Sequence, residues 1–346
     1  MRALGLLAFL LASASFAAGP PQAAKEAQGA SMKAIRFHTP GGPEVLELEE
    51  LPRPVPKAGE VLVQVFAAGV NPVDWKIRRS GGKGFGPPLP QIPGFDIAGV
   101  VASVGDGVKR FAPGDPVFGY LSLQRGGAYA EYAIALEGEL ARKPEKLSFD
   151  EAAGVPLAAL TAWQALVDTA QLDEGQAVLI HGAAGGVGHF AVQIAKARGA
   201  HVIATASQKN HEFLKKLGAD EVIDYTTQRF EEQVSGVDVV LDSIGGDTQT
   251  RSLGVLAPGG ILVSIVGGPP QAELEKRKVR GAGILVHPDG KELEEIAHLV
   301  DQGKLRVEVS ATFPLADAGK AHELSEAGHV RGKVVLHVRD APASAR

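Results

Sequence analysis

Cysteine is absent from this chain of 346 residues. Its absence excludes disulfides, cysteine nucleophiles, iron–sulfur clusters and zinc sites built from thiolates, whatever compartment the protein occupies. An excess of basic charge is lacking too, because 40 acidic residues stand against 35 basic ones and the formal net charge is −5. We therefore expect no nucleic-acid partner.

Long apolar runs are scarce as well. The segment Ala3–Leu11 is too short to span a bilayer comfortably, and no later segment is long and apolar enough. Stable membrane insertion is therefore not expected. Hydrophobic residues make up 45% of the chain and charged residues 22%, which is ordinary for a globular protein. The length predicts about two domains.

The N-terminal region differs from the rest in composition. A positive charge at Arg2, the apolar run Ala3–Leu11 and the small residues after it predict a secretory signal peptide over 1–18. The segment 19–31, rich in alanine, glycine, proline and glutamine, predicts a disordered spacer. The signal peptide indicates a periplasmic or exported protein, although no twin-arginine signal for export of a folded protein is present. The alternative is that Met32 is the true start of a cytoplasmic protein.

Two compositional zones follow the spacer. From 32 to 156, short strands such as Val61–Phe66 and Ala98–Val104 alternate with turns rich in glycine and proline, which is typical of a partly closed β-barrel. From 157 to 288, apolar runs alternate with helical stretches, which predicts a six-stranded parallel sheet with helices on both faces. The segment 289–340 is expected to complete the first domain.

The strands and helices expected after residue 157 can be named from these runs. The six predicted strands are Ala177–Ile180, His201–Thr205, Glu221–Ile223, Val237–Leu241, Gly260–Val266 and Gly283–Val286. Two helices, Lys291–Gln302 and Leu315–Ala327, should follow, and then a last strand, Lys333–Val338, that can return to the first domain.

A glycine-rich turn follows the first of these strands. Ala177–Ile180 runs into His-Gly-Ala-Ala-Gly-Gly-Val-Gly over 181–188, and apolar residues then recur at helical spacing. Strand, glycine turn and helix together form the context in which a backbone can approach the pyrophosphate of a dinucleotide. The alternative is that these glycines only permit close packing of helix on strand.

The next strand indicates which nicotinamide cofactor would bind. A site for NAD usually places an acidic residue near the end of this strand to bind the ribose hydroxyls. The segment 201–210 contains no aspartate or glutamate, whereas Ser207 and Lys209 suit a 2′-phosphate. We therefore predict NADPH, with a solvated surface lysine as the alternative interpretation of Lys209.

A series of motifs, taken in order, resembles the medium-chain dehydrogenase/reductase superfamily, in its zinc-independent quinone oxidoreductase (zeta-crystallin-like) and alkenal/enone reductase branch. The matching segments are Met32–Phe37, Gly41–Leu46, Gly69–Asp74, Pro93–Val101, Gly114–Phe118, Leu160–Leu166, Gly182–Gly188, Leu217–Asp220 and Gly332–Leu336. The resemblance implies an α/β protein. It would combine a GroES-like, partly closed β-barrel catalytic domain (32–156, completed by 289–340) with a Rossmann doubly wound parallel sheet of six strands (157–288).

The zinc-dependent members of this superfamily have ligands that this chain lacks. Where they carry Gly-His-Glu, this sequence has Gly94-Phe95-Asp96, and Asn71–Asp74 stands where they carry their first cysteine. The resemblance therefore implies no metal. Without a Lewis acid an alkoxide is hard to polarise, so hydride addition to a quinone or a conjugated enone is the easier reaction.

The resemblance also implies a set of cofactor-binding residues. Gly185, Gly186 and Val187 should line the pyrophosphate, and Thr161 should face the nicotinamide. Ser207, Lys209 and Tyr225 should surround the 2′-phosphate. The expected set is completed by Gly182 and Lys333.

Four residues are the expected catalytic group. Asn71 and Asp74 fall in the family's active-site segment, at the floor of the cleft between the domains. Lys76 stands where some quinone reductases carry a tyrosine, which favours enones over simple quinones. The proton donor could be Lys76, Tyr120 or water. The alternatives are a surface lysine for Lys76, packing for Tyr120 and a structural cap for Asp74.

The function predicted from these features is an NADPH-dependent, zinc-independent oxidoreductase. It would transfer hydride to a quinone or to the β-carbon of an α,β-unsaturated carbonyl, so its partner is a small electrophilic acceptor. The alternative is an NADPH-binding redox sensor or structural protein without turnover. In family members the edge strand expected at Gly283–Val286 commonly pairs with the same strand of a second copy, which implies a homodimer.

Overall fold

The structure is a computed structural model that describes residues 30–84 and 86–341. The predicted signal peptide (1–18) lies outside these residues, as does most of the predicted spacer. The spacer ends earlier than expected, because Ser31 already begins strand β1. Within the described residues, no helix has the length and apolar character needed to cross a membrane.

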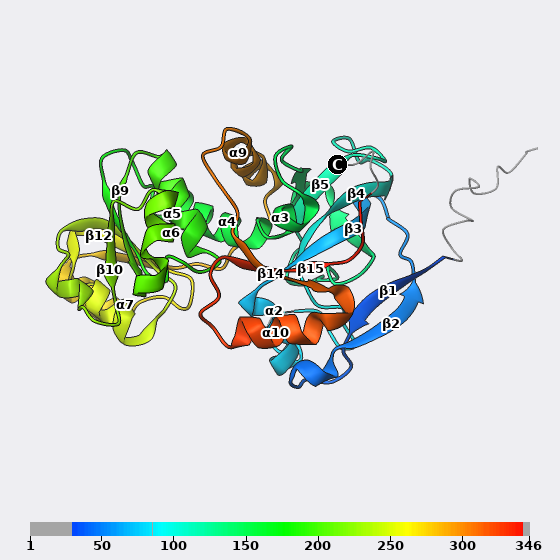
Figure 1. Cartoon of the computed structure of the whole chain (residues 1–346), viewed down its shortest axis with the longest axis horizontal. Helices are drawn as coiled ribbons and strands as arrows, with labels where there is room; N and C mark the ends of the chain where they lie inside the picture. The colour runs from blue at the N-terminus through cyan, green and yellow to red at the C-terminus, as the bar shows by residue number, and fades with distance from the viewer. Residues whose placement is uncertain (1–29, 85, 342–346) are drawn as a thin grey trace, which may run out of the picture.

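The chain folds into two lobes, which lie at opposite ends of the view in Figure 1. The barrel lobe is built on a sheet of mostly antiparallel strands, and the last strand of the chain pairs antiparallel with β3, as expected. Its strands, in sheet order, are β14 (Val309–Pro314), β15 (Lys333–His337), β3 (Glu60–Val70), β4 (Asp96–Val104), β5 (Pro116–Tyr120) and β7 (Leu140–Arg142), with β6 (Tyr132–Leu136) also paired to β3. A separate antiparallel pair consists of β1 (Ser31–Arg36) and β2 (Glu47–Pro52).

Helical segments pack around the strands of this lobe. They are η1 (Pro43–Val45), α2 (Pro72–Ser80), η2 (Glu137–Glu139), α3 (Phe149–Ala153), α9 (Gly290–Asp301), η6 (Leu315–Asp317) and α10 (Ala318–Glu326). Helix α2 begins with Asn71 at its N-cap and Pro72 in its first turn, a combination that favours helix initiation. It packs against α10, so the N-terminal and C-terminal parts of the lobe meet there.

The second lobe is a parallel sheet of six strands with helices on both faces. The strand order is β10 (Glu221–Asp224), β9 (His201–Ala206), β8 (Ala177–Ile180), β11 (Val237–Asp242), β12 (Leu256–Ser264) and β13 (Arg280–Gly283). This order reverses direction at β8, which is the doubly wound Rossmann arrangement that was predicted. The helical segments are α4 (Pro156–Trp163), the π-helical turn η3 (Gln164–Thr169), α5 (Gly188–Ala197), η4 (Gln208–Asn210), α6 (His211–Leu217), η5 (Phe230–Glu232), α7 (Gly246–Ser252) and α8 (Gln271–Arg277).

The predicted limits of two strands were wrong. The sixth strand covers Arg280–Gly283 rather than Gly283–Val286, and β12 begins at Leu256 and ends at Ser264. The apolar run after Gly283 leaves the sheet, and its Leu285 is 70% exposed. An edge strand is held by backbone hydrogen bonds and is partly solvated, so apolar side chains do not mark it.

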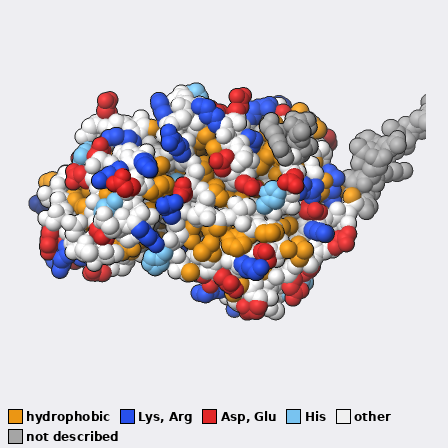
Figure 2. Space-filling view, in the orientation of Figure 1, with side chains coloured by type: hydrophobic (Ala, Val, Ile, Leu, Met, Phe, Trp, Pro, Cys, Tyr) orange, Lys and Arg blue, Asp and Glu red, His pale blue; other side chains and the backbone are white. Residues whose placement is uncertain are grey.

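Apolar packing joins the two lobes. One hydrophobic cluster contains Phe118 of the barrel lobe, Leu160 of α4, Ile194 of α5 and Leu293 of α9. Figure 2 shows acidic and basic side chains interspersed over one face of both lobes. The continuous core fixes the position of the glycine turn relative to the barrel lobe.

Candidate functional site

The glycine turn between β8 and α5 leaves no room for a side chain at Gly182 or Gly188. Gly182 has φ +63°, and a Cβ added there would lie 2.4 Å from Ser243 Oγ. A Cβ on Gly188 would lie 2.4 Å from the carbonyl oxygen of Gly182. The N–H of His189 donates to the carbonyl oxygen of Gly185 at 3.1 Å, whereas the N–H groups of Gly186, Val187 and Gly188 have no backbone acceptor among the described residues. These residues therefore fit the pyrophosphate of a dinucleotide, which needs a close backbone and free N–H donors.

The barrel lobe touches this turn through the start of β15. The Gly332 N–H donates to the carbonyl oxygen of Ala184 at 2.9 Å. A Cβ on Gly186 would lie 3.4 Å from Cδ of Lys333, so the lysine stem passes against the turn. The ammonium of Lys333 is 3% exposed and donates to the carbonyl oxygen of Val70, at 3.2 Å, and to Oδ1 of Asn71. Lys333 thus spans the junction between the lobes.

Two neighbouring strand ends carry the residues expected at the 2′-phosphate. Ser207 follows β9 and precedes η4, where Lys209 is exposed. Tyr225 follows β10 and is 53% exposed. Because β9 and β10 are paired and parallel, these three residues lie at the same end of the sheet, where both strands have their carboxyl ends. Asn210 Nδ2 lies 3.4 Å from Ser207 Oγ.

A carboxylate also lies at this end of the sheet, and the sequence argument missed it. Asp224 is the register partner of Ala206, the residue before Ser207. It accepts hydrogen bonds from the hydroxyl (2.7 Å) and the N–H (3.0 Å) of Thr226, and these bonds lower its pKa. The acidic residue of an NAD site is expected at the end of β9, whereas Asp224 ends the adjacent strand, β10.

Asn71, Asp74, Asp96 and Lys333 form a compact cluster of buried polar groups, which we call the floor cluster because the cleft floor is expected here. Asn71 donates from Nδ2 to Asp96 Oδ2 at 2.8 Å, and Lys333 Nζ lies 4.0 Å from the same oxygen. Asp74 accepts from the N–H of Asn71 at 2.7 Å and from the hydroxyl of Tyr129 at 2.8 Å, both on Oδ2. Asn71 and Asp74 are therefore in direct contact, and Asp74 also caps α2.

The carboxyl groups of this floor cluster titrate near neutral pH. Burial raises the pKa of Asp74 to about 7 and that of Asp96 to about 6. Burial also lowers the pKa of Lys333. Among the described residues none donates to Asp74 Oδ1, which adds to the cost of ionising that carboxyl. The cluster can therefore hold a proton that a small change of environment would release.

A directed chain of hydrogen bonds leads away from Asp74 toward α10. Arg78 Nη1 lies 2.9 Å from Nδ1 of His322, and a guanidinium can only donate. The other ring nitrogen of His322 therefore carries the proton and donates to the Tyr129 hydroxyl at 3.2 Å. Burial lowers the pKa of His322 to about 3, so the ring is neutral. Sequence analysis missed Tyr129 and His322, which have no motif of their own.

The other two expected catalytic residues lie outside the floor cluster. Lys76 is exposed on α2, with Nζ 5.6 Å from the centre of the Trp75 ring. Tyr120 is buried, and its hydroxyl donates to the carbonyl oxygen of Val286 at 3.5 Å. Burial raises the pKa of Tyr120, which weakens it as a proton donor.

Thr161 lies on α4, the helix whose Leu157 contacts the floor cluster. Its hydroxyl donates to the carbonyl oxygen of Leu157 at 2.6 Å, and the Leu157 N–H in turn donates to Asp96 Oδ1 at 2.8 Å. The helix that carries Thr161 is thus tied to the floor cluster through Asp96.

Two further features bear on ligands. Within residues 30–84 and 86–341, no group of three histidine, aspartate or glutamate side chains is placed to hold a metal ion. A groove of about 630 Å³ opens on the barrel lobe, lined by Met32, Pro52 and Tyr132 among others, and it contains none of the predicted site residues.

Comparisons with known proteins cover both lobes. A family profile described as "Alcohol dehydrogenase GroES-like domain" matches residues 57–145, and one described as "Zinc-binding dehydrogenase" matches residues 217–336. The "Chloroplast envelope quinone oxidoreductase homolog" of Arabidopsis thaliana is 37% identical over 325 residues, which cover 89% of this chain and 99% of that protein.

Two more similarities define the group more closely. The "NADPH-dependent alkenal/one oxidoreductase, chloroplastic" of Arabidopsis thaliana is 37% identical over 319 residues, or 88% of this chain and 79% of that protein. The solved structure of the quinone oxidoreductase from Coxiella burnetii aligns with a TM-score of 0.81 and 40% identity, covering 90% of this chain and 100% of that one. These similarities extend over both lobes of the protein.

Proposed function

The chain belongs to the medium-chain dehydrogenase/reductase superfamily, in its zinc-independent quinone oxidoreductase branch, and from this premise we propose that it is an NADPH-dependent reductase of quinones or α,β-unsaturated carbonyls. One observation carries the proposal. The glycine turn meets the floor cluster at Lys333, whose stem lies against Gly186 and whose ammonium holds Asn71. A dinucleotide on the turn would therefore end at a polar floor suited to a carbonyl acceptor.

The choice of NADPH rests on the residues that follow the carboxyl ends of β9 and β10. Ser207, Lys209 and Tyr225 offer a hydroxyl, a cation and a phenol around the position of a 2′-phosphate. A relative whose name includes NADPH supports the same choice. Asp224 opposes it, because a carboxylate at this end of the sheet repels a phosphate group. The preference for NADPH over NADH should therefore be real but moderate.

The chain's own residues would bind, orient and supply protons. A bound reduced nicotinamide supplies the hydride. The backbone of the turn binds the pyrophosphate, and Asn71 is held rigid because both ends of its amide are hydrogen-bonded, to Lys333 and Asp96. Tyr120 is a weak proton donor for the reduced acceptor, since its hydroxyl is bonded to a carbonyl oxygen and its pKa is raised. Lys76 or water is left to supply that proton.

The experiment that tests this function follows cofactor oxidation by the purified chain, with a chelator present. NADPH and NADH are compared against a panel of quinones and small enones. We expect turnover that is unaffected by the chelator, with the higher kcat/KM for NADPH. Tight binding of NADPH without turnover on any acceptor would instead establish a cofactor-binding sensor or structural protein.

We also propose that the protein is a homodimer. Strand β13 pairs only with β12 among the described strands, so its other edge is free for a second copy. Leu285, just beyond this strand, is 70% exposed, so its side chain is available to contact a second copy. Sedimentation equilibrium should give the mass of two chains, and a monomer at micromolar concentration would contradict the proposal.

A further inference from the structure

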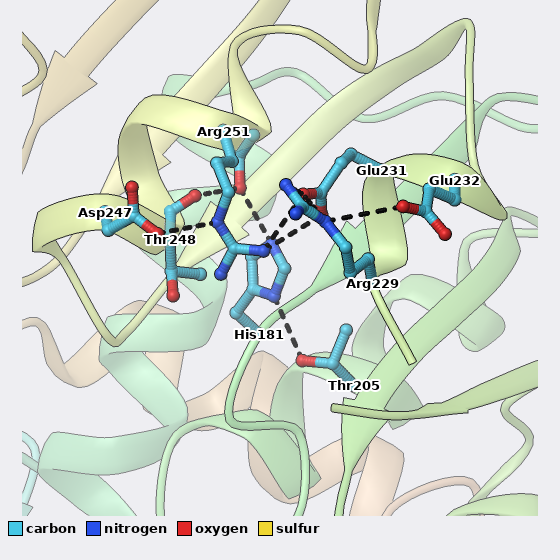
Figure 3. Close-up of polar contacts among 9 residues, drawn as sticks. His181, Thr205, Arg229, Glu231, Glu232, Asp247, Thr248 and Arg251 are labelled. Carbon is cyan, nitrogen blue, oxygen red and sulfur yellow. Dashed lines mark hydrogen bonds and ion pairs between the residues drawn. The ribbon is translucent and has the colours of Figure 1, made fainter. Parts of the chain in front are cut away.

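His181 is the first residue after β8 and begins the glycine turn. Its side chain is 2% exposed, and its ring packs edge-on against Phe230 with the centres 4.6 Å apart. Figure 3 shows the imidazole between Thr205 of β9 and the helix that carries Arg251, which is α7. The ring is therefore enclosed between three parts of the Rossmann lobe.

The hydrogen bonds of the ring fix a single tautomer. Nε2 of His181 lies 2.9 Å from Ser252 Oγ, and the Ser252 hydroxyl donates its only proton to the carbonyl oxygen of Thr248 at 2.6 Å. Ser252 must therefore accept from His181, so Nε2 carries the hydrogen. Burial lowers the pKa of His181 to about 4, which leaves the ring neutral at ordinary pH. Nδ1 is then an acceptor, and the Thr205 hydroxyl donates to it at 3.0 Å.

Backbone hydrogen bonds also join His181 and Thr205 to the neighbouring strands and to the glycine turn. The N–H of His181 donates to the carbonyl oxygen of Leu241 in β11 at 3.0 Å, and its own carbonyl oxygen accepts from the Ser243 hydroxyl at 2.8 Å. The carbonyl oxygen of Thr205 accepts from the N–H of Ala183, inside the turn, at 3.3 Å. One residue thus joins the ends of β8, β9 and β11.

Charged side chains surround this neutral centre without bonding to the ring. The Arg251 guanidinium lies 4.9 Å from the centre of the Phe230 ring and pairs with Glu231 and Asp247, both at 2.9 Å. Arg229 pairs with Glu231 from the other side, at 2.7 Å. These ion pairs neutralise the charges nearest the imidazole, and Asp242 is the remaining acidic neighbour. They also anchor α7, the helix that carries Ser252.

We propose that His181 is a positioning residue that couples the glycine turn to the loop expected to hold the 2′-phosphate. Thr205 stands two residues before Ser207 and four before Lys209, so the bond from Thr205 to the ring sets where that loop begins relative to the turn. His181 would therefore determine how strongly the protein prefers NADPH over NADH, and it would leave the chemical step unchanged. The inference rests on the proposed use of NADPH.

The decisive variant is Thr205→Val, because valine has nearly the shape of threonine and removes only the hydrogen bond to Nδ1. Binding of NADPH and NADH to the full chain is measured by calorimetry, which needs no turnover. We expect the Kd for NADPH to rise about tenfold, the loss of one buried hydrogen bond, while the Kd for NADH changes less than about twofold. Thr205→Ser keeps the hydroxyl and should restore the wild-type Kd for NADPH. At saturating NADPH, kcat should stay within about twofold of wild type.

Each outcome of this experiment decides the matter. An unchanged ratio of the two Kd values in Thr205→Val, or an equal loss for both cofactors, would overturn the coupling. His181→Asn provides a second test, in which the same selective loss is expected together with a lower thermal stability, because Thr205 and Ser252 lose their buried partner. Lys209→Ala separates this inference from the choice of cofactor. If Lys209→Ala leaves the ratio unchanged and wild type does not prefer NADPH, the assignment of NADPH has failed; if only Thr205→Val has no effect, the role of His181 has failed.

Discussion

Each lobe buries a network of polar side chains, and the two networks differ in charge. Beneath the glycine turn, the centre is a neutral imidazole, His181, bonded to two hydroxyl groups. On the cleft floor, Asp74, Asp96 and Lys333 are all ionisable and all buried. The first network holds the Rossmann lobe in one geometry, and the second brings titratable groups to the place where the acceptor is expected.

The difference follows from the cost of burying charge. A neutral group whose hydrogen bonds are satisfied costs little to bury, and its contribution does not change with pH while it stays neutral. A buried carboxylate loses its hydration and recovers it only through partners, so its pKa rises. The neutral network is therefore suited to positioning, whereas the floor cluster is suited to holding a proton. Three experiments test this contrast.

The largest effect is expected from Lys333→Met. Methionine keeps the stem against Gly186 but removes the cation that faces Asp96 and holds Asn71. Breaking a buried charge pair from one side leaves the other charge uncompensated and typically costs about 3–5 kcal/mol. We expect a loss of that size in the free energy of unfolding at pH 8, measured with urea.

A surface ion pair gives the matched control for this variant. Lys196 pairs with Asp220 at 2.7 Å, but both side chains are partly exposed. Lys196→Met should cost no more than about 1 kcal/mol, the usual limit for solvated pairs. Equal losses in the free energy of unfolding of the two variants would show that Lys333 does not form a buried charge pair with Asp96.

The second effect concerns pH. The pKa of Asp74 is raised to about 7, above its value of about 3.9 in an unfolded chain. Between these values the native state binds more protons than the unfolded state, so the contribution of Asp74 to stability falls as the pH rises. Asp74→Asn cannot ionise and lacks this slope. The free energy of unfolding of the variant minus that of wild type should therefore be about 2–3 kcal/mol larger at pH 8 than at pH 5.

A carboxyl group with the opposite shift provides the comparison. The pKa of Asp115 is lowered, mainly by a hydrogen bond from the Ala112 N–H, so it is ionised in both states throughout this range. The difference between Asp115→Asn and wild type should not vary from pH 5 to pH 8. A flat difference for Asp74→Asn as well would mean that Asp74 is ionised in the native protein and that the floor cluster holds no proton.

The glycine turn was predictable from sequence because its determinants are local. The strand Ala177–Ile180, the glycines over 182–188 and the helix after them adjoin one another, and each has a recognised residue pattern. The position of Ser207 and Lys209 after a strand was predictable for the same reason, because they follow a single apolar run. The doubly wound sheet followed from the alternation of such local patterns. Its sixth strand did not, because an edge strand such as Arg280–Gly283 carries no apolar signature.

The floor cluster was only partly predictable, because its contacts join distant parts of the chain. Asn71 and Asp74 were found through their motif, but Tyr129 and His322 hydrogen-bond across 193 residues, and His322 lies on an ordinary amphipathic helix. No local spacing records such a contact. Asp224 shows the same limit over a shorter distance, because it comes close to Ser207 only through the pairing of two strands.

The smallest effect is expected in the neutral network, from Ser252→Ala. This change leaves Nε2–H of His181 and the carbonyl oxygen of Thr248 without their shared partner, which should cost about 1–2 kcal/mol. Because the imidazole is neutral in the native state well above its pKa of about 4, the cost should be the same at pH 5.5 and pH 8. Thr250→Ala, on the same helix but exposed, removes a longer hydrogen bond of 3.3 Å to Gly246 and should cost less than about 0.5 kcal/mol. If the cost of Ser252→Ala varied with pH as strongly as the effect of Asp74→Asn, the buried imidazole would be taking up a proton in that range, and the distinction between a positioning network and a titrating one would be lost.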